Sequence, residues 1–415
     1  MNKKRAIILG ATCFIIVILG TMFYGYKIYS KVKKYDSLIY PRVIIEDEDV
    51  SGKTQEEAKK VLNDKYQSLL QNKKINIKVE NKTYTIGYSQ IGAKYDIDNS
   101  VKQAYDYGKG GNVIERYKLL KNPTVKNIKL SFDYSSNTKP IDDLINTIKN
   151  QVNRNPKDAS VIKNGSNFVI TPDQDGFKLK DEELKKDIIS AINGQIGSDP
   201  VVQGNMETVK ANITKEKLSG INTLISTFST NYGAISSPGR MTNIQLATRT
   251  INGKVIMPGE TFSFNGILGK RTAEKGYQAA PVDIGKTTGM GLGGGICQVS
   301  TTLYNAALLA GIKPTVRTHH SIPSAYVSLG HDATVDYDGK LDYQFKNTFN
   351  FPIYIEGSSA NGLETFNIYS DGSLKSKTYK VVDDVVEGGK RVKLYLQTYQ
   401  NGKMIANELI SDDTY

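Results

Sequence analysis

Hydrophobic residues are concentrated in one stretch near the start of the chain. Residues 6–26 contain no charged side chain and consist mainly of Ile, Leu, Val, Phe and Ala. A helix of this length can cross a hydrocarbon core of about 30 Å, so residues 1–35 are predicted to form a short cytoplasmic segment and a transmembrane anchor. Basic residues at positions 3–5 favour a cytoplasmic N-terminus, although lysines after the stretch weaken that argument. A cleaved signal peptide is the alternative, but the stretch is long for one and no small-residue cleavage site follows it.

Two segments after the anchor combine helical and strand spacing. In the first, residues 36–125, apolar side chains recur every three or four positions from Ala58 to Leu69, which is typical of a helix. The second segment, residues 126–214, repeats this organisation. Neither segment contains cysteine or histidine, so both are interpreted as small α+β modules that bind or act as spacers. The predicted helices cover 54–70, 141–152 and 181–192, and the predicted strands cover 43–50, 75–79, 83–87, 159–162 and 167–170.

A third region, residues 215–375, has short strands between glycine-rich loops and one strongly apolar helix. Apolar residues spaced three and four apart indicate that helix from Ile296 onward, and Pro314 stops it. The region is predicted to be a β-rich domain around this central helix, followed by a β-hairpin tail at 376–415. The chain is therefore predicted to be an α+β, multidomain protein. Strands are predicted at 254–257, 261–264, 324–329, 333–337, 341–345, 353–356, 379–386, 391–399 and 404–410.

The start of the apolar helix carries a candidate nucleophile. Three consecutive glycines end at Gly295 and lead into Cys297, in the first helical turn. Backbone N–H groups at a helix N-terminus favour a thiolate and can also hold an oxyanion. We therefore identify Cys297 as the candidate nucleophile and the N–H groups of Gly295, Ile296 and Gln298 as candidate oxyanion donors. The alternative is a buried cysteine that only packs.

The three histidines of the chain all lie within 34 residues after Cys297. A cysteine nucleophile needs a nearby base, and the base needs a group that orients it. Either His319 or His320, together with Asp332 or Asp336, would complete such a set.

A zinc site is a competing interpretation of one cysteine and three histidines. The sequence lacks Cys-x-x-Cys and His-Glu-x-x-His spacing, so no metal is predicted. Residues 289–294 match the letters of a dinucleotide-binding pattern, but no clear apolar strand precedes them and no acidic residue follows at the usual distance. No cofactor is predicted.

Composition limits the remaining possibilities. The chain has 415 residues, enough for two to four domains. Of its two cysteines, Cys13 falls in the apolar stretch, so no disulfide is expected and Cys297 remains a free thiol. The net charge of +12 suits anionic partners such as lipid headgroups or wall polymers. A nucleic-acid partner is not predicted, because the chain has no tryptophan and no compact basic run beyond the anchor.

Several runs of the third region occur together in one known pattern. They are Arg240 with Asn243-Ile244, Ile251-Asn252-Gly253, Pro258-Gly259-Glu260-Thr261-Phe262-Ser263-Phe264-Asn265, Gly293-Gly294-Gly295-Ile296-Cys297-Gln298-Val299-Ser300, His320-Ser321 and Asp332-Ala333-Thr334-Val335. This pattern closely resembles the VanW family. Upstream, Asp96-Ile97-Asp98 and Pro172-Asp173 with Gly176 resemble the peptidoglycan-binding domains that precede VanW domains in envelope proteins of the Gram-positive, clostridial type.

The resemblance implies an activity, since some VanW proteins are regarded as cysteine L,D-transpeptidases that form 3–3 peptidoglycan cross-links. It implies that Cys297 is the nucleophile and that His320, followed by Ser321 as in the family pattern, is the base. Asp332 is a candidate for the group that orients the base, and its alternative role is that of a strand-edge or turn residue. The candidate substrate-binding residues are Arg317, Arg271, Ser321 and His319. For each arginine, a structural ion pair is the alternative role.

The resemblance also implies a location and partners. The chain is expected to be held in the cell membrane with its bulk facing the cell wall, where it meets peptidoglycan stem peptides and glycan. Two other functions stay open. One is a wall-binding or scaffold protein in which Cys297 packs, and the other is a cysteine hydrolase that transfers the stem peptide to water.

Overall fold

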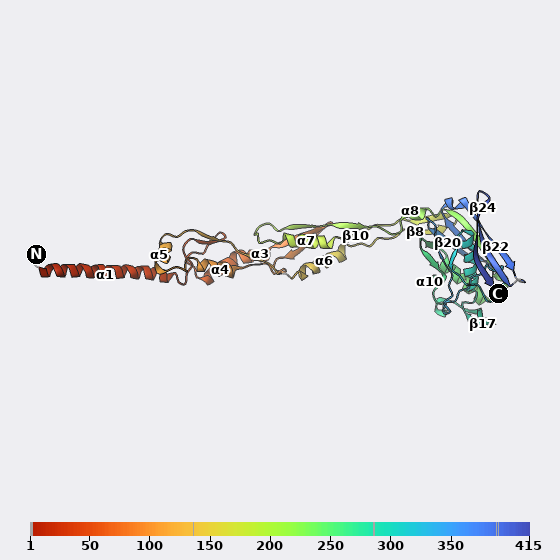
Figure 1. Ribbon diagram of the computed structural model, residues 1–415, viewed down its shortest axis with the longest axis horizontal. Coiled ribbons are helices and arrows are strands. Elements are labelled where there is room, and N and C mark those ends of the chain that lie inside the picture. Colours follow the sequence, from red (N-terminus) through yellow and green to blue (C-terminus); the bar gives the residue numbers. More distant parts are fainter. Residues whose placement is uncertain (1–2, 136, 285–286, 387, 389) are drawn as a thin grey trace. The chain divides into compact units, whose positions relative to one another are not determined.

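The chain folds into two compact units of mixed helices and strands (Figure 1). The N-terminal unit comprises residues 1–155 and 176–209, and the C-terminal unit comprises residues 156–175 and 210–415. The prediction of an α+β, multidomain fold is confirmed. The structure is a computed structural model, and it describes every residue except 1–2, 136, 285–286, 387 and 389.

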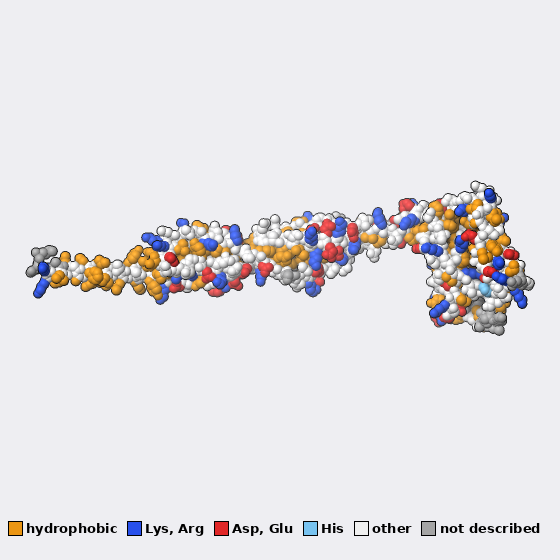
Figure 2. Space-filling view, viewed as in Figure 1, with side chains coloured by type: hydrophobic (Ala, Val, Ile, Leu, Met, Phe, Trp, Pro, Cys, Tyr) orange, Lys and Arg blue, Asp and Glu red, His pale blue; other side chains and the backbone are white. Residues whose placement is uncertain are grey.

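Helix α1 (Lys3–Lys34) contains the apolar stretch. The rest of the protein buries none of its most apolar window, and Figure 2 shows hydrophobic side chains along its visible surface. Among the described residues, α1 alone is long and apolar enough to cross a membrane. The apolar part of a signal sequence would meet the same test, so α1 by itself is compatible with either a membrane-anchored or a secreted protein.

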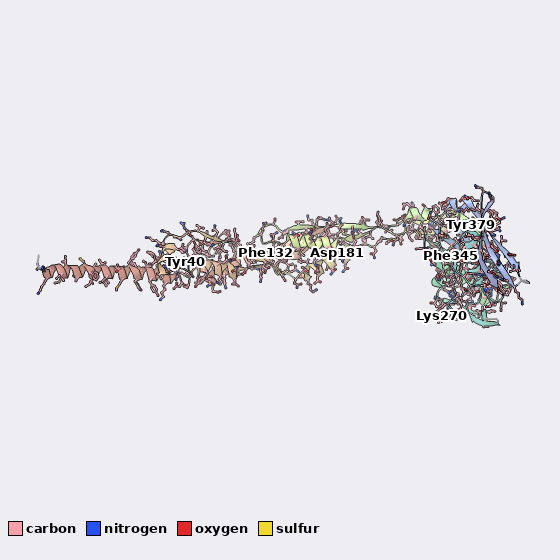
Figure 3. The ribbon with its side chains drawn as sticks, in the orientation of Figure 1. Tyr40, Phe132, Asp181, Lys270, Phe345 and Tyr379 are labelled. Atoms are coloured by element: carbon pink, nitrogen blue, oxygen red, sulfur yellow. The ribbon has the colours of Figure 1, made fainter. Side chains whose placement is uncertain are left out.

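The N-terminal unit contains two hydrophobic cores, and the side chain of Tyr95 packs against both. Two of the aromatic side chains of these cores, Tyr40 and Phe132, are labelled in Figure 3. The helix predicted over 54–70 is confirmed, although a wider π-helical turn interrupts it after Leu62. Thr54 starts this helix with a capping box, since its side chain and that of Glu57 each accept the other's backbone N–H.

The N-terminal unit also contains several short sheets. The predicted hairpin is formed by β3 (Lys74–Val79) and β4 (Lys82–Gly87), and β11 (Val201–Gly204) adds a parallel strand to it. The other strands are β1 (Val43–Ile45), β2 (Glu48–Asp49), β5 (Lys94–Tyr95), β6 (Lys126–Ile128), β7 (Phe132–Asp133), β10 (Gly176–Leu179) and β12 (Met206–Val209). The other helices are α2 (Gln55–Leu62), the π-helical turn Asn63–Gln67, α3 (Ser68–Asn72), α4 (Ile97–Asp106), α5 (Val113–Lys121), α6 (Lys139–Val152) and α7 (Asp181–Ala191).

The C-terminal unit is organised around α11 (Ile296–Leu309), as predicted. Twelve of its 14 residues are buried, so neighbouring elements cover the helix on nearly all sides. It packs on β13 (Thr223–Asn231) and β21 (Leu363–Ser370), two strands of an antiparallel sheet with the order β13-β21-β20-β14. A second helix, α9 (Pro238–Ile251), lies against α11 and the same sheet. The main hydrophobic core includes Phe345, which is labelled in Figure 3.

Smaller sheets and helices complete this unit. The tail forms the three-stranded antiparallel sheet β22-β23-β24, which confirms the predicted strands beyond residue 376. The remaining elements are β8 (Ser160–Asn164), β9 (Asn167–Thr171), α8 (Lys215–Ser219), β14 (Lys254–Ile256), β15 (Thr261–Ser263), α10 (Phe264–Leu268), β16 (Ala279–Ile284), β17 (Thr287–Leu292), β18 (Pro314–Val316), β19 (Gln344–Lys346), β20 (Ile353–Ala360), β22 (Lys377–Val386), β23 (Arg391–Gln400) and β24 (Lys403–Thr414).

The hairpin β8–β9 belongs to the C-terminal unit. Ala159 and Val161 at its start share a small core with Leu218, Ile221 and Tyr354. The stretch 126–214, predicted as one module, therefore contributes residues to both units. The boundaries of the five predicted segments stay predictions.

Two predicted strands, at 324–329 and 333–337, are wrong. Residues 321–335 form turns and irregular backbone, and only Asp336 makes an isolated bridge, with Leu341. The reason is that side chains of α11, rather than a neighbouring strand, satisfy the backbone of this segment. Asn305, for example, donates to the carbonyl oxygen of His331 at 2.7 Å.

The hydrophobic pattern also missed α9 and β13. Both bury polar side chains, so their inner faces are not marked by apolar residues alone. Asn243 and Thr248 are buried on α9, and Ser226 and Thr230 are buried on β13.

Those polar residues belong to a buried layer beneath α11. Glu364 of β21 is fully buried and accepts hydrogen bonds from the hydroxyls of Thr248 at 2.7 Å and Thr302 at 3.4 Å. Thr302 Oγ1 is 2.8 Å from Thr230 Oγ1, which accepts a bond from Gln298 Nε2 at 2.9 Å. Burial raises the pKa of Glu364 to about 8, and the threonine hydroxyls oppose this only in part.

We expect the Glu364 carboxyl to make the C-terminal unit less stable as pH rises. The unfolded chain ionises this group above its ordinary pKa of 4.5, whereas the folded protein keeps it neutral until about pH 8. Its contribution is therefore fully present below pH 4.5 and is lost as pH rises through 8. The unfolding free energies of Glu364→Gln and the unmodified protein would be measured in urea at pH 5 and pH 8. From pH 5 to pH 8, we expect the variant to gain roughly 2–4 kcal/mol relative to the unmodified protein. An unchanged difference would contradict a neutral Glu364.

Candidate active site

Three glycines before α11 form a turn that other residues would not tolerate. Gly293 and Gly295 have φ values of 85° and 105°, in the left-handed region that L side chains avoid. Gly294 is required by close packing, because a Cβ there would lie 2.4 Å from the carbonyl oxygen of Pro281 and 2.7 Å from that of Ala280. The turn is thus pressed against β16, and α11 begins at a defined point.

The buried side chain of Asn243 ties this turn to α9. Its Nδ2 donates to the carbonyl oxygens of Gly294 at 3.0 Å and Gln278 at 2.9 Å, and its Oδ1 accepts the N–H of Gln278 at 2.8 Å. A side-chain amide can donate two hydrogen bonds and accept two, and Asn243 uses three of these four to position the loop.

Cys297 lies in the first turn of α11 and is partly exposed. Its Sγ is 3.5 Å from the carbonyl oxygen of Val335. Of the predicted oxyanion donors, the N–H groups of Ile296 and Gln298 already donate to carbonyls of the glycine turn, at 3.2 and 3.1 Å. Within the described chain, the N–H of Cys297 itself has no backbone acceptor. The N–H of Gly295, the third predicted donor, also has no backbone acceptor there, so the N–H groups of Gly295 and Cys297 are the ones left for an oxyanion.

The polar side of α11 holds the segment that follows the histidines. Ser300 Oγ donates to the carbonyl oxygen of Ala333 at 2.6 Å, and the N–H of Ala333 donates to Thr301 Oγ1 at 3.0 Å. Asn305 binds the next part of the segment through the carbonyl oxygen of His331. These contacts place Asp332 between two anchored residues beside the helix.

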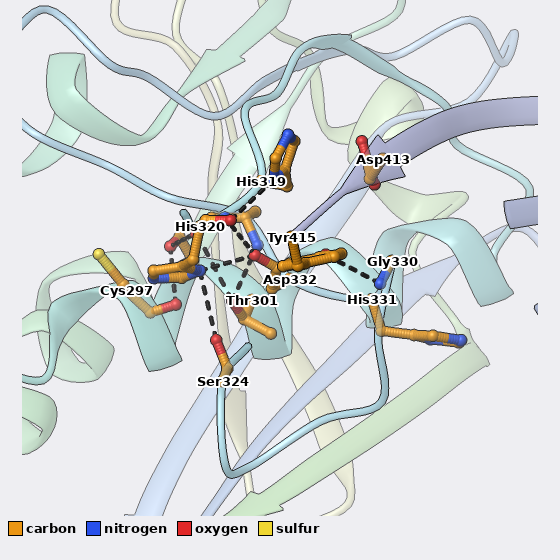
Figure 4. A network of polar contacts seen from close by, with 12 residues as sticks. Cys297, Thr301, His319, His320, Ser324, Gly330, His331, Asp332, Asp413 and Tyr415 are labelled. Atoms are coloured by element: carbon orange, nitrogen blue, oxygen red, sulfur yellow. Dashed lines mark hydrogen bonds and ion pairs between the residues drawn. The ribbon is translucent and has the colours of Figure 1, made fainter. Parts of the chain in front are cut away.

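His320 lies between Cys297 and Asp332 (Figure 4). Its Nδ1 is 2.7 Å from Asp332 Oδ2, and the same oxygen accepts the backbone N–H of His320 at 2.5 Å. Both side chains are buried. With Nδ1 directed at Asp332, Nε2 is the ring nitrogen left for the Cys297 side chain, which interacts with His320, and a base oriented by a carboxylate has this arrangement. Of the two predicted aspartates, the structure brings Asp332 rather than Asp336 to the histidine.

Electrostatics favour a charged His320–Asp332 pair. Burial alone lowers the pKa of His320, but the hydrogen bond to Asp332 and the adjacent Cys297 side chain outweigh it and raise the pKa to about 10. For Asp332, burial alone raises the pKa, while hydrogen bonds from His320 and Tyr415 and the charge of Arg317 lower it to about 2. The carboxylate is therefore ionised, and it stabilises a positive charge on the ring.

Arg317 occupies a structural position. Its buried guanidinium pairs with Asp332 at 3.2 Å and with Asp413 at 2.5 Å, and it donates to the carbonyl oxygens of Gly330 and Asp332. These partners favour the ion-pair alternative over binding of a substrate carboxylate. The hydroxyl of Tyr415 also binds Asp332 Oδ1.

Arg271 is better placed for a substrate. Its side chain packs beside Gly293 and over the ring of Phe264, and Nη1 donates to the carbonyl oxygen of Gly269 at 3.0 Å. Burial lowers its pKa, and charges that include Cys297 oppose that effect. Its Nη2 is buried and has no hydrogen-bond partner in the described part of the protein. A substrate carboxylate could supply one once the side chain becomes exposed.

The other predicted residues are spread around the pair. His319 Nδ1 is 2.7 Å from the carbonyl oxygen of His320, and its ring lies 5.0 Å from that of Tyr415. Ser321 is exposed. The Gln298 side chain points inward and joins Arg240 to the buried layer, with Arg240 Nη2 donating to Gln298 Oε1 at 2.9 Å.

Sequence reasoning missed several residues of the site. Ser324 Oγ is 3.3 Å from His320 Nδ1. The hydroxyl of Tyr326 interacts with Ser324 and Thr301, and burial followed by the charge of Cys297 raises the pKa of Tyr326. Both residues fall in the segment predicted as a strand, and that prediction hid their approach to His320. Among the described residues, no group of three or more His, Cys, Asp or Glu side chains is placed to hold a metal ion.

Comparison with known proteins shows which family the chain resembles in sequence. A family model described as VanW like protein matches residues 239–369. The uncharacterized protein YoaR of Bacillus subtilis (strain 168) is 34% identical over 237 residues, which make up 57% of this chain and 76% of YoaR. The chain belongs to the VanW family. The vancomycin B-type resistance protein VanW of Enterococcus faecalis is 32% identical over 124 residues, 28% of this chain and 44% of that protein.

A second family model, described as "putative peptidoglycan binding domain", matches residues 84–199. This VanW-family protein is thus associated with the cell wall, either membrane-anchored or secreted. No solved structure matches it. The VanW match begins in α9 and ends in β21, so it includes the glycine turn, Cys297, His320 and Asp332. Asp413 and Tyr415 lie beyond it.

Proposed function

We propose that this VanW-family protein is a cysteine L,D-transpeptidase, held in the membrane by α1, that forms 3–3 cross-links in peptidoglycan. The observation that carries the proposal is the arrangement of Cys297 at the start of α11, His320 beside it, and Asp332 bound to His320 Nδ1 at 2.7 Å. A nucleophile, an oriented base and a helix N-terminus together suit acyl transfer.

In the proposed first step, the Cys297 sulfur attacks the carbonyl carbon of the third residue of a tetrapeptide stem. A carbon–sulfur bond forms, the bond to the terminal D-Ala breaks, and His320 passes the thiol proton to the departing amine. The N–H of Cys297 supports the oxyanion, and Arg271, whose buried Nη2 has no hydrogen-bond partner among the described residues, would pair with a stem carboxylate once its side chain becomes exposed.

In the second step, an amine from a neighbouring stem attacks the thioester. The new amide bond forms, the carbon–sulfur bond breaks, and His320 carries a proton from the amine back to the sulfur. The thioester retains the energy of the original amide bond, so the cross-link needs no nucleotide, which suits a reaction outside the membrane.

A binding role without turnover is a second candidate. The region matched by the peptidoglycan-binding model overlaps a cavity of ≈ 530 Å³. Its walls include the rings of Tyr66, Tyr95 and Phe132 and the polar residues Glu46 and Asn193. Aromatic faces with a few polar groups are typical of small-ligand sites, and such a site is compatible with either function.

Analysis of the products separates these functions. The full chain in detergent and its Cys297→Ala variant would each be incubated with disaccharides that carry tetrapeptide stems. The products would be identified by mass spectrometry. We expect dimers that lack one D-Ala, formed by the unmodified protein and absent with the variant. Shortened monomers would show hydrolysis, and unchanged substrate together with retained binding to cell walls would show a binding protein; either result contradicts the transpeptidase.

A further inference from the structure

We propose that the C-terminal sheet β22-β23-β24 contributes to this active site, because Tyr415, which directly follows β24, positions Asp332 for His320. The inference rests on the proposed function of Cys297. It assigns a role to a segment that lies beyond the residues matched by the VanW family model.

The first support is the double role of the Tyr415 hydroxyl. It donates a hydrogen bond to Asp332 Oδ1 and accepts the backbone N–H of Gly330 at 2.9 Å. One hydroxyl therefore fixes both the carboxylate and the backbone two residues before it. Tyr415 is itself held, since its N–H donates to the carbonyl oxygen of Lys390 at 2.8 Å.

A second contact joins the same strand to the same loop. Asp413 binds Arg317 at 2.5 Å and accepts a hydrogen bond from Ser411 at 2.9 Å. Arg317 in turn binds Asp332 Oδ1 and the carbonyl oxygens of the loop. The loop also packs on the sheet, because a Cβ on Gly330 would lie 3.2 Å from the side chain of Val392 on β23.

These contacts divide the two oxygens of Asp332 between separate tasks. Oδ2 accepts both hydrogen bonds from His320, and Oδ1 accepts those from Tyr415 and Arg317 (Figure 4). A carboxylate with both oxygens engaged cannot rotate without breaking bonds. His320 Nδ1 therefore keeps Asp332 Oδ2 as its nearest acceptor, and the orientation of the ring is fixed. Removing the Tyr415 hydroxyl leaves Oδ1 with Arg317 as its partner, and the carboxylate and the ring lose part of this constraint.

Alkylation of Cys297 tests the inference without the cross-linking reaction. The full chain in detergent would carry Cys13→Ala, so that Cys297 is the only thiol. Its rate of reaction with iodoacetamide would be followed by intact mass from pH 5.5 to 9, alone and with Tyr415→Phe, Tyr399→Phe or His320→Ala. Tyr399 is the matched control, because its hydroxyl lies on the same sheet and binds Gln397 at 2.8 Å instead of the site.

We expect Tyr415→Phe to slow alkylation between pH 6 and 7 about tenfold and to move the pH profile toward that of His320→Ala, with Tyr399→Phe unchanged. A Tyr415→Phe profile that superimposes on the parent, while His320→Ala is slowed, overturns the inference and leaves the proposed function standing. A parent profile that His320→Ala does not alter overturns both.

Thermal unfolding would be measured on every variant, because Tyr415→Phe also leaves the Gly330 N–H unpaired. If Tyr415 had only a structural role, Tyr415→Phe would lower the melting temperature and leave the alkylation profile unchanged. That result would contradict the inference that Tyr415 positions Asp332. Should Tyr415→Phe not fold, Asp413→Asn replaces it. This variant removes the charge that holds Arg317, and we expect it to slow alkylation in the same pH range; an unchanged profile overturns the inference.

Discussion

Replacing His320 by alanine is expected to slow acylation of Cys297 by about 10²–10⁴-fold, the usual contribution of a positioned acid–base group. His320 is the residue that contacts both the thiol and Asp332. Without it the thiol proton has no acceptor aligned by a carboxylate. The rate would be measured as release of D-Ala from a tetrapeptide stem under single-turnover conditions.

His319→Ala is the matched control. The neighbouring imidazole interacts with the His320 carbonyl oxygen and the ring of Tyr415, and neither contact reaches the sulfur. We expect a much smaller loss for this variant. Equal losses for His319→Ala and His320→Ala would remove the assignment of His320 as the base.

Gly294→Ala is expected to destabilise the C-terminal unit by at least about 3 kcal/mol. The added Cβ would meet two backbone carbonyl oxygens of β16, at 2.4 and 2.7 Å, and neither can rotate away as a side chain would. Either the glycine turn separates from β16 or α11 begins elsewhere. The loss would appear in urea unfolding, and activity should fall with it because Cys297 follows the turn.

Gly220→Ala provides the comparison within the same unit. Gly220 has a helical φ of −65°, and its Cβ would make only ordinary contacts, at 3.6 Å from Lys217 and Phe351. A helical glycine replaced by alanine costs little or adds stability. If the two variants unfolded alike, close packing at Gly294 would not be the reason for that glycine.

Local spacing was sufficient for the elements whose buried faces are apolar. The helix at Ile296 and the tail strands were predicted because their inner residues are hydrophobic. The same reasoning failed for α9 and β13, which turn Asn243, Thr248 and Ser226 inward. A buried polar residue looks like a surface residue until its hydrogen-bond partners are known.

The predicted strands at 324–329 and 333–337 failed for a related reason. Alternating residues suggested a strand, but the backbone of this segment is bound by Ser300, Thr301 and Asn305 of α11. The polar residues of this buried helix were the available signal. Their partners lie about 30 residues away along the chain, beyond the reach of local spacing.

The sequence by itself determined the apolar N-terminal helix, the glycine turn, and the cysteine at the start of the central helix, because each depends on neighbouring residues. It also restricted the candidate base to two adjacent histidines, of which the family resemblance favoured His320. Only the tertiary structure shows that His320, and not His319, meets Asp332, because residues 12 apart are brought together by folding. The part played by Tyr415 was out of reach, because it binds Asp332 from 83 positions away, and contacts over such separations are set by the packing of whole elements.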